Sequence, residues 1–68
     1  MAALHFDQRG RVLLEDSFGE SWLVVEANEA LYFITHTESR RFAPVSVAWK
    51  ELSADELEFY LRAAAPTR

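Results

Sequence analysis

Residues 22–37 have the sequence WLVVEANEALYFITHT, and this stretch decides the fold class. β-branched and aromatic residues dominate on both sides of its centre, a composition typical of strands. We therefore expect strands over residues 22–27 and 31–37, joined by a turn at Asn28 and Glu29. Asn28 could also begin a helix, but the aromatic and β-branched residues that follow it favour a strand.

Two turns that contain glycine come before this stretch. Residues 7–10 separate a short apolar segment at 4–6 from another at 11–15, and residues 16–20 separate that segment from Trp22. Glycine adopts the positive φ that tight hairpin turns require. We expect these segments to form antiparallel strands joined by tight turns, with the strand order left open.

The next segments give weaker signals. Residues 38–41 are polar and are predicted to form a connection. Residues 42–49 resemble a further strand, but Pro44 has no N–H to donate. The sequence therefore predicts a strand at 42–49 that lies at an edge of the sheet or contains a bulge at Pro44.

A C-terminal helix has the clearest local signature. Ser53-Ala54-Asp55-Glu56 has the pattern of a capping box, and Glu58 and Arg62 are spaced as an i,i+4 ion pair. Pro66 marks the end of the helix. One apolar stripe is predicted to face the sheet: Leu57, Tyr60, Leu61 and Ala64.

These elements predict an α+β fold in one domain over residues 1–68. A small antiparallel sheet of four or five strands carries one C-terminal helix packed on one face; a partly closed barrel is the alternative. The 68 residues include no cysteine, so no disulfide can stabilise a core of this size. A domain this small usually needs added stabilisation, for which self-association or a partner is one source.

The two central strands have more apolar surface than one helix can cover. Adjacent strand residues point to opposite faces, and both faces of residues 22–27 and 31–35 are mainly apolar. Either the sheet curls around its aromatic residues, or a second copy or another protein covers a patch. Phe59 falls off the helix stripe, and we expect it in such a contact with some of the following: Phe18, Trp22, Tyr32 and Trp49.

The net charge of −4 argues against direct nucleic-acid binding, which needs cations to neutralise phosphates. The carboxylates are concentrated in residues 12–39, which contain no Lys or Arg. If they form one surface, it could occupy a cationic groove made for phosphates. The candidate partner-binding acids are Glu15, Asp16, Glu20, Glu26 and Glu29, with Asp55 and Glu58 as a second row.

Catalysis and metal binding have little support in the sequence. No glycine-rich phosphate loop or strained nucleophile turn is present, and we expect no enzyme activity and no cofactor. His5-x-Asp7 and His36-x-Glu38 would have to meet in space to hold a metal ion. We interpret both as surface pairs and predict no metal site.

The sequence thus predicts a non-enzymatic protein–protein interaction module. One version is a small acidic inhibitor that blocks a nucleic-acid-binding groove of its target; inhibitors of antiviral defence carried by phages and mobile elements are similar in size and charge only. The alternatives are a homodimer that buries a second apolar sheet face and single-stranded nucleic-acid binding through Arg40, Arg41 and Trp49. With no signal peptide or membrane-spanning stretch in the sequence, we expect a cytoplasmic location.

Overall fold

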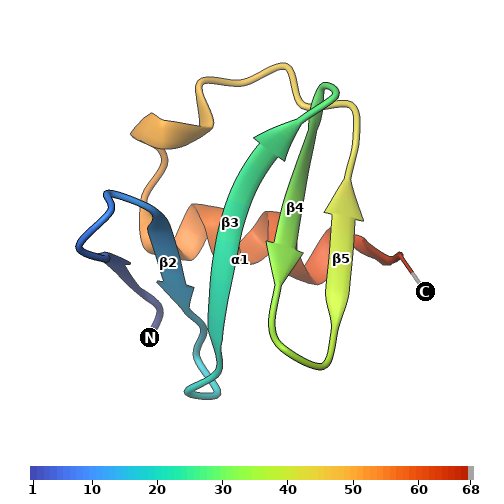
Figure 1. Ribbon diagram of the computed structural model, residues 1–68. Helices are drawn as coiled ribbons and strands as arrows, with labels where there is room; N and C mark the ends of the chain where they lie inside the picture. Colours follow the sequence, from blue (N-terminus) through green and yellow to red (C-terminus); the bar gives the residue numbers. More distant parts are fainter. Residues whose placement is uncertain (68) are drawn as a thin grey trace.

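The computed structural model describes residues 1–67 and has one helix behind an antiparallel sheet (Figure 1). The strands lie side by side in chain order: β1 (Ala3–Phe6), β2 (Val12–Glu15), β3 (Ser21–Ala27), β4 (Ala30–Ile34), β5 (Ser39–Phe42) and β6 (Ala65–Pro66). A 3₁₀ helix, η1 (Trp49–Glu51), comes before the helix α1 (Ala54–Ala63). The predicted α+β class is confirmed, with six strands in place of four or five. β1 and β6 form the two edges, so the sheet is open and the barrel alternative is wrong.

The first two hairpin turns have the same construction, an Asp followed three residues later by a Gly. In each, the carboxylate oxygen Oδ1 of the aspartate accepts the backbone N–H groups two and four residues ahead, at 2.8–2.9 Å. The glycines, Gly10 and Gly19, have φ of 79° and 84°. The turn after β3 is tighter: Asn28 and Glu29 have φ of 53° and 61°, as a two-residue hairpin requires.

The prediction for residues 38–49 was wrong. β4 ends at Ile34, because Thr35 and Glu38 close a turn through their backbones and the Thr35 hydroxyl. This turn brings residues 39–42 beside β4 as the strand β5, where a polar connection was expected. The chain then leaves the sheet before Pro44, and residues 42–49 form no strand beyond Phe42.

Helix α1 follows its sequence signature closely. The Ser53 hydroxyl accepts the Glu56 N–H at 3.2 Å, and the Ser53 N–H donates to the Glu56 carboxylate at 2.8 Å, which completes the capping box. The predicted apolar stripe faces the sheet, with Leu57, Leu61 and Ala64 buried and Tyr60 half-buried.

The hydrophobic core lies between α1 and one face of the sheet. Leu14, Leu31 and Phe33 point from the strands toward Leu57 and Leu61 on the helix, and all five are almost fully buried. We call this side of the sheet the inner face. The opposite side, turned toward the viewer in Figure 1, is the outer face.

Candidate interaction surfaces

The outer face carries a block of five apolar side chains on three neighbouring strands. The register pairs Leu13 with Leu23 and Leu23 with Ile34, while Val25 pairs with Tyr32 in the adjacent row. Leu13, Leu23, Tyr32 and Ile34 are half-buried, and Val25 is 37% exposed. The only α-helix in the described residues packs on the inner face, so these five side chains have no covering element. We refer to Leu13, Leu23, Val25, Tyr32 and Ile34 as the outer apolar block.

Charged residues lie at both ends of this block, with opposite signs. Arg41 pairs with Tyr32 across the sheet, and Arg11, just before β2, lines a hollow together with Val25. Glu15 ends β2 at the other end of the block, beyond Leu13, and its carboxylate lies 3.3 Å from the His5 ring. The outer face therefore has a cationic end, with Arg41 and with Arg11 in an ion pair to Asp7 at 2.6 Å, and an acidic end at Glu15.

A hollow of about 440 Å³ adjoins the cationic end. It lies where β3 extends past the start of β2, and its lining includes Arg11, Val25, Glu26, Trp49 and Lys50. Glu26 accepts the indole N–H of Trp49 at 2.8 Å, and the Lys50 ammonium lies 5.8 Å from the Trp49 ring centroid. These contacts hold η1 against β3.

The predicted aromatic contact residues divide between the core and the surface. Trp22 and Trp49 are only 3% and 5% exposed, which leaves Phe18, Tyr32 and Phe59 as the members of that set open to a partner. The flat rings of Trp22 and Trp49 fill the interior of a small domain, and each indole N–H donates a hydrogen bond to a carboxylate. Tyr32 lies on the outer face, whereas Phe18 and Phe59 are strongly exposed on the helix side of the molecule.

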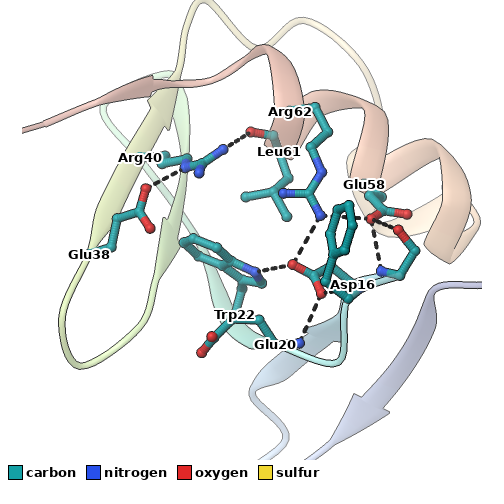
Figure 2. A network of polar contacts seen from close by, with 10 residues as sticks. Asp16, Glu20, Trp22, Glu38, Arg40, Glu58, Leu61 and Arg62 are labelled. Atoms are coloured by element: carbon teal, nitrogen blue, oxygen red, sulfur yellow. Dashed lines mark hydrogen bonds and ion pairs between the residues drawn. The ribbon is translucent and has the colours of Figure 1, made fainter.

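Asp16 is buried and does not form part of an acidic surface. Its carboxylate accepts the Trp22 indole N–H at 3.0 Å and the Arg62 guanidinium at 3.0 Å, besides the two backbone N–H groups of its turn (Figure 2). The side chain is only 3% exposed. Asp16 therefore joins the β2–β3 turn to the core and to helix α1.

Glu58 also joins the β2–β3 turn to the helix. We refer to Asp16, Glu58 and Arg62 as the clamp. The Glu58 carboxylate accepts both the N–H and the hydroxyl of Ser17, at 2.9 and 2.7 Å, and lies 3.0 Å from the Arg62 guanidinium. Arg62 also packs over the Phe18 ring, 4.9 Å from its centroid. The predicted pair of Glu58 and Arg62 is confirmed, but its second function, fastening the turn, was not predicted.

The clamp shifts the pKa values of its members. Burial alone would raise the pKa of Asp16, yet the hydrogen bonds from Trp22, Glu20, Phe18 and Arg62 hold it below its ordinary value. Hydrogen bonds from the Ser17 backbone and hydroxyl lower the pKa of Glu58. Both carboxylates therefore bind protons more weakly in the folded chain than in the unfolded chain.

This difference predicts that acid destabilises the fold. A carboxylate with a lowered folded-state pKa stabilises the fold above its unfolded pKa, and this contribution is lost as the pH falls through the folded value. We expect the urea midpoint to decrease from about pH 5 downward, and the Asp16→Asn variant to show a shallower decrease. Urea titrations between pH 7 and pH 3 measure this; a midpoint that stays constant over that range would contradict it.

The remaining candidate acids do not form one row. Glu20 and Glu29 are exposed, but they lie in turns at opposite ends of β3. The Glu26 carboxylate is hydrogen-bonded to Trp49, and Asp55 accepts the backbone N–H of Ala2 at 3.3 Å. Because antiparallel hairpins alternate in direction, successive turns of a meander always lie at opposite ends of the sheet.

The basic and aromatic cluster of the nucleic-acid alternative is also divided. Arg40 lies on the inner face, where it stacks 5.2 Å from the Trp22 ring, pairs with Glu38 and donates to the Leu61 carbonyl (Figure 2). Arg41 lies on the outer face, and Trp49 is buried. These three residues therefore do not share one platform.

The two histidine–carboxylate pairs are likewise far from each other. His5 lies on β1 and His36 follows β4, with β2 and β3 between them. Within residues 1–67, no three His, Cys, Asp or Glu side chains are grouped as metal ligands. No helix of that part of the chain has the length and apolar character needed to cross a membrane.

Comparison of the chain with known protein families, with curated protein sequences and with solved structures finds no match in any of the three.

Proposed function

We propose that this chain is a non-catalytic, cytoplasmic protein–protein interaction module, and that its contact surface is the outer apolar block. The observation that carries the proposal is that one helix covers one face of the sheet, while five adjacent apolar side chains on the other face have no covering element within residues 1–67. Contiguous apolar surface of this kind marks interaction sites in small soluble proteins.

The acidic-inhibitor version has weaker support from the geometry. Asp16 and Glu58 are engaged in the clamp, and the exposed acids Glu20 and Glu29 lie at opposite ends of β3. A phosphate-like row would need these carboxylates side by side. The outer apolar block needs no rearrangement, because its members are already neighbours in the register.

Photo-cross-linking in host cells tests the proposed function. A benzophenone side chain at Val25 is expected to form a protein adduct, because this position lies inside the contact. The adduct is expected to disappear when Leu23→Asp is introduced, since a buried, unpaired charge opposes the contact.

The matched control places the same probe at Ala63, an exposed position on the helix side. Equal adducts at Val25 and Ala63, or a Val25 adduct that survives Leu23→Asp, would contradict the proposal.

A further inference from the structure

We propose that the occupant of the outer apolar block is a second copy of this chain, stacked face to face with its strands antiparallel to those of the first. The inference rests on the proposed function and identifies the partner. Two sheets that pack in this way interdigitate their apolar side chains, with strands inclined by about 30°.

The charge polarity along β2 favours this occupant. Arg11 comes just before β2 and its carbonyl continues the ladder by accepting the Asp7 N–H, so alternation puts it on the same face as Leu13 and Glu15. A two-fold axis in the interface, perpendicular to the strands, turns one copy end over end. The Arg11 end of each copy then faces the Glu15 end of the other, so the contact is self-complementary.

Both charged groups are accessible for such a contact. The Arg11 side chain is 53% exposed and the Glu15 side chain is 45% exposed. The Nε of Arg11 donates to Asp7 at 2.6 Å, and its terminal nitrogens have no hydrogen-bond acceptor among the described residues. Glu15 has one contact, with His5 at 3.3 Å, in the same part of the chain.

Arg41 strengthens the polarity, because it lies on the outer face beside Tyr32 at the same end as Arg11. No carboxylate of the described residues pairs with it. Glu15 would repel a partner whose surface is uniformly acidic. Arg11 and Arg41 would repel one whose surface is uniformly basic. Opposite charges at the two ends fit an inverted copy of the same surface.

The size of the chain points in the same direction. With 68 residues and no cysteine, it relies on a small core without covalent crosslinks. Domains of this size commonly gain stability by oligomerisation. Face-to-face pairing would remove the outer apolar block from water without a disulfide.

Sedimentation equilibrium of the purified chain tests the inference through a charge swap. Wild type is expected to form a dimer. Arg11→Glu and Glu15→Arg should each raise its dissociation constant about tenfold, because each change opposes like charges at two symmetry-related places. The double variant, Arg11→Glu with Glu15→Arg, is expected to restore the wild-type constant.

Glu51→Arg is the matched control for Glu15→Arg, since it makes the same change in net charge on the exposed surface of η1. It should leave the dissociation constant unchanged. A chain that stays monomeric, a dimer indifferent to both single variants, or a double variant that fails to recover overturns the inference. If the chain stays monomeric but the Val25 probe still forms an adduct in cells, the partner is not a second copy. The proposed function is not contradicted by that result.

Discussion

Replacing Asp16 by alanine is expected to lower the free energy of unfolding by about 3 kcal/mol, a large part of the total for a domain of this size. The substitution leaves the buried indole N–H of Trp22 without an acceptor and removes the partner of Arg62. It also frees two backbone N–H groups of the β2–β3 turn. Urea unfolding at one fixed protein concentration measures the loss as a lower midpoint with an unchanged slope.

The first hairpin supplies a matched control for this prediction. Asp7 accepts the same two backbone N–H groups in its own turn, but its second oxygen contacts the neighbouring Arg11 and no core residue. Asp7→Ala is therefore expected to cost much less than Asp16→Ala. Equal losses in the two variants would show that the turn, and not the clamp to Trp22 and helix α1, carries the stabilisation.

Phe33→Ala is expected to lower the free energy of unfolding by about 4 kcal/mol, because it leaves a cavity at the centre of the core. The Phe33 side chain is fully buried beneath α1. Tyr32, the preceding residue, points to the outer face, and Tyr32→Ala should cost less than about 1 kcal/mol through its lost cross-strand contacts. The pair compares the two faces of the same strand at adjacent positions.

Urea midpoints at a concentration low enough to keep any dimer dissociated check this difference. Phe33→Leu, expected to cost about 1 kcal/mol, provides a measurable value if the alanine variant does not fold. Similar losses at Phe33 and Tyr32 would mean that both faces are covered within one chain, against the assignment of the outer face to a partner.

The local elements could be predicted from the sequence where neighbouring residues determine them. The capping box at Ser53 and the glycines of the first two turns act through backbone groups a few residues away. Residues 39–42 could not be recognised as a strand, because their pairing depends on the Thr35 turn and on contact with β4. Their polar composition reflects Arg40, whose guanidinium packs on Trp22 in the folded chain.

The sequence predicted a second apolar face of the sheet, but it did not predict which residues form the outer apolar block. Alternation along β3 and β4 correctly indicated a second apolar face, which the structure locates on the side away from α1. Whether the acids form one surface was open from the sequence, because it depends on the strand order. The internal function of Asp16 had one signal in the sequence, the Asp-x-x-Gly spacing shared with Asp7, but its contact with Arg62 is long-range and depends on the fold.

The most direct test of the outer apolar block as a contact surface is methyl NMR with a soluble paramagnetic chelate, which relaxes only accessible protons. Val25 and Val47 are matched probes, 37% and 40% exposed in the isolated chain. In concentrated host lysate, where a second copy and any other partner are present, the relaxation of the Val25 methyls is predicted to fall well below that of Val47. Equal relaxation of the two valines under those conditions would contradict the account.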